Sequence, residues 1–499
     1  MITPSCGPRQ SSLVEKGLLR PSLRVKIQRV AFLYVAILAV AAAAILAVLH
    51  FGAQLQTPGT VVATAASQPT EQPSALAATL ASLGEKGADP VSRLFLQLLV
   101  ILAFSRLMGM IFTRLGQPSV VGEMAAGILL GPSLFGWLAP DAFGFVFAAS
   151  SLGTLKLMSQ VGVCLFMFSV GMELDADHVR GKAHSSLLVS HCSIVFPYLL
   201  GVGLAYFLYT GLAQPGATFM AFALFMGISM AITAFPVLAR ILQDRGIFKS
   251  PLGSTAITCA AVGDVTAWII LAFVVAVVRA TNMAASALNL LLVAAFVALM
   301  LYGVRPLLPR LVGRARLESQ DLPKGVLALM FCVVIGAALC TEIIGIHTLF
   351  GAFLAGAIMP ETDGFRHKLA LRLENFSTVL LLPLFFVFTG LRTQVGLLND
   401  TQGWLVCLLI IAVASLGKLA GTAVPARLTG ASWRDALQLG ALMNTRGLME
   451  LIALNIGYDL GILSPRIFTM LVIMALVTTM LTGPLLSLFG QRQASVAEG

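Results

Sequence analysis

One aspartate, Asp264, lies in the middle of the apolar stretch AAVGDVTAWIILA. A carboxylate that is removed from water is unfavourable in its charged form unless a proton or a cation accompanies it. The residue type and its place therefore predict a site that binds either a proton or a metal cation. The alternative is a permanent ion pair with a basic side chain.

A second stretch, ISMAITAFPVLARIL at residues 228–242, contains a proline within a helical pattern. Pro236 lacks an amide proton, and its ring clashes with the carbonyl group four residues earlier. Carbonyl groups near Ile232 and Thr233 are therefore expected to lose their helical partners and to become ligands for an alkali cation. A simple kink of the helix is the alternative.

The stretch ALMNTRGLMELIALNIG at residues 441–457 is interrupted in a similar way, by Asn444, Thr445 and Gly447 around Arg446. Two interrupted helices in corresponding positions are typical of the binding sites of secondary transporters. The stretch is therefore expected to form the second half of the same site.

Three further charged side chains lie inside apolar stretches. Arg446 and Glu450 are spaced i, i+4 and can neutralise each other, although Glu123 in VVGEMAAG competes for Arg446. We expect these residues to form structural pairs that fix the second interrupted helix. Lys418 in ASLGKLAGTAVPA is either a counter-charge for Asp264 or extends its amine to the membrane surface.

The composition identifies the environment of these residues. Of the 499 residues 58% are hydrophobic and only 11% are charged, which excludes a water-soluble globular protein. Apolar runs long enough to cross a bilayer recur after residue 90, and they lack the alternation of β-strands. The predicted fold is an all-α polytopic membrane protein with thirteen spans, at roughly 92–113, 118–137, 152–173, 184–209, 216–240, 252–278, 285–303, 325–341, 344–360, 376–397, 403–424, 436–456 and 466–489.

The distribution of basic residues predicts the orientation. Of 32 lysines and arginines, 24 fall on one side of these spans, six on the other, and two, Lys418 and Arg446, within spans. The rich side is expected to be cytoplasmic and to include the C-terminus. The net charge of +10 then reflects topology, so no nucleic-acid partner is expected. The expected location is the inner membrane of a bacterium.

The chain divides into four segments by composition. Residues 1–51 combine a basic N-terminus with an apolar run, expected to be a retained anchor helix although a signal peptide is the alternative. Residues 52–90 are expected to form a flexible linker, residues 91–490 the membrane domain, and residues 491–499 a short cytoplasmic tail.

An internal repeat is visible in the membrane domain, in units at about 115–280 and 344–489. The matching positions are Gly122 and Gly127 with Gly351 and Gly356, Gly171 with Gly390, and Asp244 with Asp459. Seven spans, an odd number, separate corresponding helices, so the second unit is inverted relative to the first. Inverted five-helix repeats are an architecture of secondary transporters.

Six motifs in this order resemble those of the second branch of monovalent cation/proton antiporters, which includes Kef-type potassium efflux proteins and plant cation/proton exchangers: QPSVVGEMAAGILLGPS, TAFPVLARIL, AAVGDVTAWIILA, GIHTLFGAFLAG, LPLFFVFTGLRT and NTRGLMELIALNIG. The resemblance covers roughly residues 91–490. It implies a sodium/proton-antiporter-like fold with two broken, crossing helices, a homodimer, and elevator-like alternating access.

The same resemblance implies roles for individual residues. Asp264 is expected to carry both cation and proton, Thr233 and neighbouring carbonyl groups to bind the ion, and Lys418 to pair with Asp264. Members of the family commonly have Asn, Asp or Gln immediately before the aspartate, whereas this chain has Gly263. Kef-type proteins usually append a soluble nucleotide-binding domain, and gating through such a domain is not expected here.

The predicted function is therefore exchange of potassium or sodium for protons, with monovalent cations, protons and the lipid bilayer as partners and no cofactor. Two alternatives stay open, a gated cation channel and an ion-coupled symporter of an organic anion. An enzyme is not expected, since no Ser/His/Asp set, metal-ligand cluster or phosphate-binding loop is visible. The seven scattered cysteines are expected to be packing residues.

Overall fold

The computed structural model describes residues 89–173, 183–279, 283–312, 323–360 and 365–490. All of them fall within one compact unit, Thr79–Gly499. The expected anchor at 30–51, all but the last two residues of the linker, and the tail at 491–499 lie outside the described residues.

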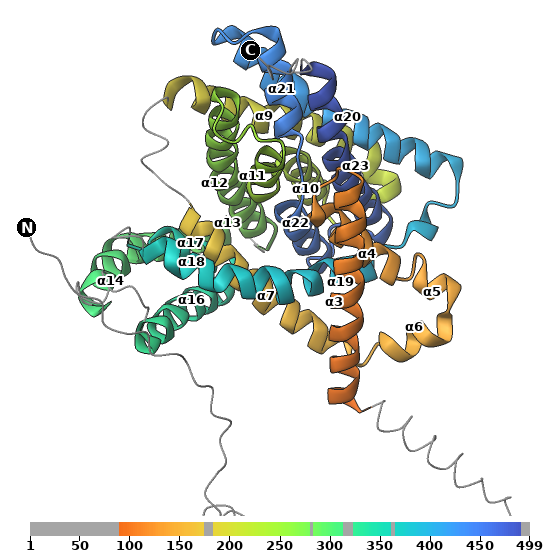
Figure 1. The fold of residues 1–499 in the computed structure, drawn as a ribbon, viewed down its shortest axis with the longest axis horizontal. Helices are drawn as coiled ribbons and strands as arrows, with labels where there is room; N and C mark the ends of the chain where they lie inside the picture. The colour runs from red at the N-terminus through yellow and green to blue at the C-terminus, as the bar shows by residue number, and fades with distance from the viewer. Residues whose placement is uncertain (1–88, 174–182, 280–282, 313–322, 361–364, 491–499) are drawn as a thin grey trace, which may run out of the picture. The chain divides into compact units, whose positions relative to one another are not determined.

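The described residues are almost entirely helical and contain no β-strand, only an isolated bridge between Ala213 and Leu463 (Figure 1). The elements of the first half are α3 (Pro90–Arg114), α4 (Ser119–Leu130), α5 (Phe135–Leu138), α6 (Pro140–Val146), α7 (Leu152–Glu173), α9 (Ala183–Leu212), α10 (Phe219–Ala231), α11 (Phe235–Asp244) and α12 (Pro251–Arg279).

The elements of the second half follow after a connecting region. They are α13 (Met283–Ala298), η1 (Leu299–Val304), α14 (Arg305–Val312), α16 (Lys324–Ile344), α17 (Thr348–Ala357), α18 (Phe365–Phe376), η2 (Ser377–Leu381), α19 (Leu382–Arg392), η3 (Val395–Leu397), α20 (Thr401–Leu428), α21 (Trp433–Met443), α22 (Leu448–Asp459) and α23 (Pro465–Phe489).

Within the described ranges, 11 helices are long and apolar enough to cross a membrane. They correspond to eleven of the thirteen expected spans. The remaining two, at 344–360 and 436–456, correspond to the short apolar helix α17 and to the pair α21 and α22, which is interrupted and polar at its centre. The count of thirteen is therefore not confirmed, while the all-helical membrane fold is.

The first helix of each repeat packs against a helix of the other repeat. Helix α4 packs against α19, and its counterpart α17 packs against α7. A Cβ atom at Gly127 would overlap the backbone of Phe386, and one at Gly356 would overlap the backbone of Phe168. The glycines that reveal the repeat in the sequence are thus positions where two helix backbones approach too closely for any side chain.

Both interrupted helices are broken rather than kinked. Helix α10 ends at Ala231, residues 232–234 are not helical, and α11 begins at Phe235, with Pro236 in its first turn where no amide proton is needed. Helix α21 ends at Met443 and α22 begins at Leu448, after a linker that ends with Gly447.

Helices α9 and α20 pack against each other and against the two broken helices. Two glycines of α20 make this packing close, because a Cβ atom at Gly417 would lie 3.2 Å from Pro197 Cα and one at Gly421 would lie 3.0 Å from the Cys192 carbonyl oxygen. Lys418 lies between these glycines and is buried. The small neighbours therefore bring a lysine into the interior beside the broken helices.

Candidate functional site

The nonhelical segments of the two broken helices hydrogen-bond to each other. The Ala234 amide donates to the Thr445 carbonyl oxygen at 3.0 Å, and the Thr233 hydroxyl donates to the Met443 carbonyl oxygen at 2.9 Å. Each segment satisfies polar groups of the other, which have no water to bond in the interior of a membrane protein. The two breaks therefore meet at one point, called the crossing below.

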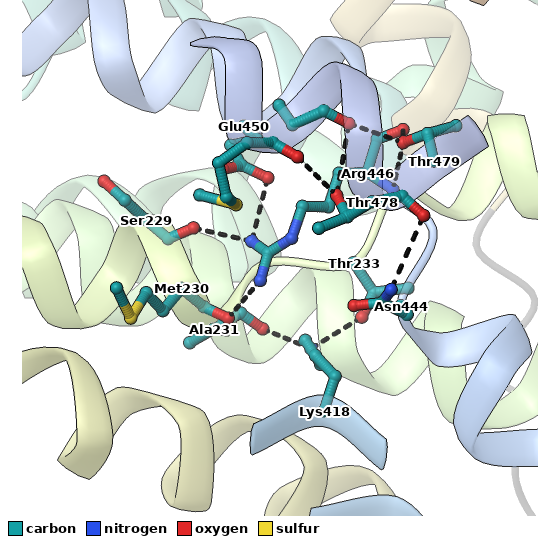
Figure 2. Close-up of polar contacts among 12 residues, drawn as sticks. Ser229, Met230, Ala231, Thr233, Lys418, Asn444, Arg446, Glu450, Thr478 and Thr479 are labelled. Carbon is teal, nitrogen blue, oxygen red and sulfur yellow. Dashed lines mark hydrogen bonds and ion pairs between the residues drawn. The ribbon is translucent and has the colours of Figure 1, made fainter. Parts of the chain in front are cut away.

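The guanidinium group of Arg446, from the second break, lies against the C-terminal end of α10. It donates to the carbonyl oxygens of Ser229 at 2.7 Å and Met230 at 2.8 Å, and to the carboxylate of Glu450 at 2.9 Å (Figure 2). Both charged side chains are fully buried. The last carbonyl groups of a helix have no helical partners and carry a partial negative charge, so this cation neutralises them.

Lys418 covers the next carbonyl group of the same helix end. Its ammonium donates to the Ala231 carbonyl oxygen at 2.5 Å and to the Thr233 hydroxyl at 2.7 Å. The hydrogen bonds of Lys418 thus go to the first break, and its ion pair with Asp264 stays a prediction.

Asp264 is buried on α12, which packs against α10 and α11. The inverted repeat indicates which surface it faces. Asp264 follows Pro251, the first residue of α12, at the same distance along the helix as Thr478 follows Pro465, the first residue of α23. The Thr478 carbonyl accepts from Asn444 at 3.5 Å in the second break. The symmetry of the repeat therefore predicts that Asp264 lies against the first break.

Threonines of α23 bind the second break. The Thr479 hydroxyl accepts from the Arg446 amide at 2.9 Å and donates to the Arg446 carbonyl at 2.8 Å, and the hydroxyl of Thr482 lies 3.3 Å from that of Thr445. All are buried. Our sequence analysis missed Thr479 and Thr482, although VTTMLTG places hydroxyls on one face of an apolar helix.

Four buried charges therefore surround the crossing. Lys418, Arg446 and Glu450 have no exposed surface, and Asp264 is 2% exposed. Buried charges are stable only when they are paired and hydrogen-bonded, and here two cations accompany two carboxylates. Of the predicted site residues, Ile232, Thr233, Asn444 and Thr445 also lie at the crossing.

One cavity reaches this centre from the end of the molecule where α11 and α23 terminate. It has a volume of about 350 Å³ and is lined by residues that include Gln117, Arg245 and Thr479. A second cavity of about 350 Å³ is lined by residues that include Arg106 and Glu123. The carboxylate of Glu123 lies 4.0 Å from the guanidinium of Arg106. Arg446 therefore pairs with Glu450 rather than with Glu123, the competing partner considered in the sequence.

A polar group of four residues lies near the C-terminal end of α22 and is called the α22 cluster below. Arg392 donates to Asn455 at 2.9 Å and to Asp459 at 2.7 Å, and Lys156 lies 3.3 Å from Asp459. The cavity lined by these four side chains measures about 30 Å³, roughly the volume of one water molecule.

Comparison with known proteins agrees with this geometry. The family model described as the transmembrane sodium/hydrogen exchanger matches residues 99–491. The Na(+)/H(+) antiporter NhaS4 of Synechocystis is 44% identical over 389 residues, which cover 78% of this chain and 95% of that protein. The K(+)/H(+) antiporter 1 of Saccharomyces cerevisiae is 31% identical, but the match covers 80% of this chain and only 47% of the yeast protein.

A solved structure supports the fold independently. The sodium proton antiporter MjNhaP1 from Methanocaldococcus jannaschii superposes with a TM-score of 0.59 at 15% sequence identity, covering 80% of this chain and 100% of that chain. At this identity the likeness concerns the fold alone. The family resemblance of the six sequence motifs is confirmed by the family model and by NhaS4, and the chain therefore belongs to the sodium/hydrogen exchanger family.

Proposed function

We propose that the chain is a secondary transporter that exchanges a monovalent cation, potassium or sodium, for protons across a membrane. The observation that carries this proposal is the charged centre at the crossing of two broken helices, next to a cavity that opens toward one end only. Relatives of the chain are named as sodium/proton and potassium/proton antiporters. A buried, paired set of charges beside a one-sided cavity suits exchange better than a continuous pore.

In this proposal Asp264 binds either a proton or a cation. When the site is empty, the positive charge of Lys418 stabilises the Asp264 carboxylate. An entering cation takes over this role, and a proton neutralises the carboxylate instead. Since the two occupants exclude each other, loading from one side and release to the other produce exchange rather than cotransport.

Thr233 is the proposed second ligand. Its hydroxyl donates its proton to the Met443 carbonyl, so its oxygen lone pairs face the Lys418 ammonium. If an entering cation displaces the ammonium, the same lone pairs become available to the cation. Carbonyl groups of the first break beside Ile232 complete the proposed oxygen shell, which is the ligand type that hard cations prefer.

The remaining parts of the proposal concern assembly and orientation. The chain forms a homodimer, and the crossing moves with its flanking helices in an elevator-like step. The end of the molecule near Arg245, where the large cavity opens, faces the cytoplasm of a bacterial cell, in keeping with the excess of basic residues on that side. No cofactor takes part.

The test is a pH-gradient assay with the purified full-length chain in liposomes. Potassium, sodium, lithium and rubidium are added in turn, and a pH-sensitive dye reports proton movement in the lumen. We expect at least one cation to dissipate the gradient in wild-type vesicles and none to do so with Asp264→Asn. Asp141→Asn, which changes an exposed aspartate on α6, is the control and is expected to be active.

Persistent exchange by Asp264→Asn would reject the role of the aspartate. Cation flux in wild-type vesicles without any coupled proton movement would reject exchange and favour a channel instead. Stimulation of proton movement by an organic anion rather than by a cation would favour a symporter.

A further inference from the structure

Thr479 differs from its neighbour Thr478 in that its hydroxyl also binds the backbone of another element. It accepts from the amide of Arg446 at 2.9 Å, and its single proton is shared between the carbonyl oxygens of Arg446 and of Ala475 in its own helix, both at 2.8 Å. The hydroxyl of Thr478 instead donates to carbonyls of its own helix, those of Met474 and Ala475. One hydroxyl therefore holds the backbone of Arg446 on both sides of its Cα atom.

This backbone position determines what the Arg446 side chain reaches. Arg446 lies in the nonhelical linker before Gly447, so the helical hydrogen-bond ladder does not fix it. Its guanidinium nevertheless meets the carbonyl oxygens of Ser229 and Met230 at 2.7 and 2.8 Å. A rigid backbone lowers the entropy that a long side chain loses when it is fixed in such a geometry.

Thr479 also borders the cavity of about 350 Å³ that opens beside Arg245. The residue is only 1% exposed. It therefore forms part of the wall between the cavity and the crossing.

We propose that Thr479 is a positioning residue for cation binding. By fixing the Arg446 backbone, its hydroxyl keeps the guanidinium on the last turn of α10 and thereby keeps the first break, with Thr233, in the geometry that binds the cation. This inference rests on the proposed exchange function and adds a residue that acts through Arg446 without touching the cation.

The experiment compares three variants in the liposome assay, using the alkali cation that gives the largest signal with wild type. Thr479→Val keeps the size of the side chain and removes both hydrogen bonds. We expect the apparent KM for the cation to rise about tenfold, which corresponds to about 1.4 kcal/mol of lost binding free energy. The maximal rate per folded transporter is expected to stay within about twofold of wild type.

Thr479→Ser retains the hydroxyl and is expected to bring the apparent KM back to within about twofold of wild type. Thr469→Val is the matched control. Thr469 is also fully buried on α23, and its hydroxyl also accepts from a backbone amide outside the helix, that of Gln394 at 3.1 Å. This variant removes an equivalent hydrogen bond far from the crossing, so the apparent KM is expected to stay unchanged.

An unchanged KM for Thr479→Val, or a lower maximal rate at unchanged KM, would overturn the inference, because a structural role alone reduces the amount of active protein. An equal rise in KM for Thr469→Val would do the same. Neither result touches the proposed function, which fails only if wild-type vesicles show no cation/proton exchange.

Discussion

The two broken helices are related by the repeat, yet they are stabilised in different ways. The first break, residues 232–234, contains no charged residue, and cations from elsewhere, Lys418 and Arg446, cover the end of its leading helix α10. The second break contributes one of these cations itself and is bound by hydroxyl groups of α23. One repeat therefore supplies the proposed, neutral binding surface, and the other supplies charge that stabilises it.

The same division applies to the helices behind the breaks. The first repeat has Asp264 where the second has Thr478, at equal distances from the prolines that begin α12 and α23. The symmetric architecture thus contains one carboxylate at these two matching positions rather than two. The comparison indicates that the backbone follows the two-fold relation while the ion-binding chemistry does not.

The largest expected effect concerns the charge of the second break. Arg446→Met leaves Glu450 buried without its partner and removes the donors to Ser229 and Met230. Loss of one member of a buried pair costs about 3–5 kcal/mol, so the variant is expected to unfold at much lower temperature in detergent. Thermal unfolding monitored by intrinsic fluorescence measures this.

The double variant Arg446→Met with Glu450→Met sharpens this prediction. It removes both charges, so much of the lost stability is expected to return, while exchange stays impaired because α10 lacks its cation. A double variant as unstable as the single one would mean that Arg446 acts through the carbonyl groups rather than through Glu450.

The next effect compares one threonine from each of the two breaks. Thr233 bonds to a charged ammonium at 2.7 Å and to Met443 at 2.9 Å, whereas Thr445 lies 3.3 Å from one neutral hydroxyl. Hydrogen bonds to charged groups are worth about 1.5–3 kcal/mol. Thr233→Val is therefore expected to lower cation exchange by at least about tenfold, and Thr445→Val by less than about threefold. Equal losses would contradict the assignment of the binding surface to the first break.

A third comparison tests where the repeats are equivalent. Gly127 and Gly356 occupy matching positions, and a Cβ atom at either would overlap the backbone of a facing helix. Overpacking of this kind costs about 1–3 kcal/mol. Gly127→Ala and Gly356→Ala are expected to lower thermal stability by similar amounts, whereas Gly144→Ala, where nothing lies within 4 Å, is expected to have little effect. A difference between the first two would show that the repeats are not equivalent there.

The smallest expected effect concerns matching aspartates at the ends of α11 and α22. Asp244 pairs with Arg240 of its own helix at 3.1 Å, whereas Asp459 joins α22 to Arg392 of α19 and Lys156 of α7. The second group is partly exposed, so its contribution is at most about 1 kcal/mol. Asp459→Asn is expected to raise the turnover of exchange by no more than about fivefold because α22 is then joined less firmly to α19 and α7. Asp244→Asn is expected to leave turnover unchanged.

Several features of the fold were predictable from the sequence for physical reasons. Membrane spans follow from length and hydropathy, and both breaks follow from residues that interrupt a helix, Pro236 in one and Gly447 in the other. The repeat followed from glycines whose backbone contacts allow no side chain, as at Gly127. These signals depend on local chain chemistry, which a single sequence displays directly.

The partners of the charged residues were not predictable in the same way. Lys418 bonds to the end of α10, from which it is 187 residues away along the chain, and Arg446 reaches the same end across 217 residues. Hydropathy and spacing indicate that such charges need partners without saying which carbonyl groups they meet. The α22 cluster was missed because its residues fall at helix ends, where charged side chains usually have no special role.

The balance of charge at the crossing has an electrical consequence. If all four buried groups are ionised, the two cations and two carboxylates sum to zero, and binding of either one proton or one monovalent cation at Asp264 gives the centre a charge of one. A centre that crosses the bilayer with the same charge in both loaded forms gains as much from the transmembrane voltage in one direction as it loses in the other. Exchange at one-to-one stoichiometry would then be driven by concentration gradients alone and would continue unchanged when an ionophore collapses the voltage.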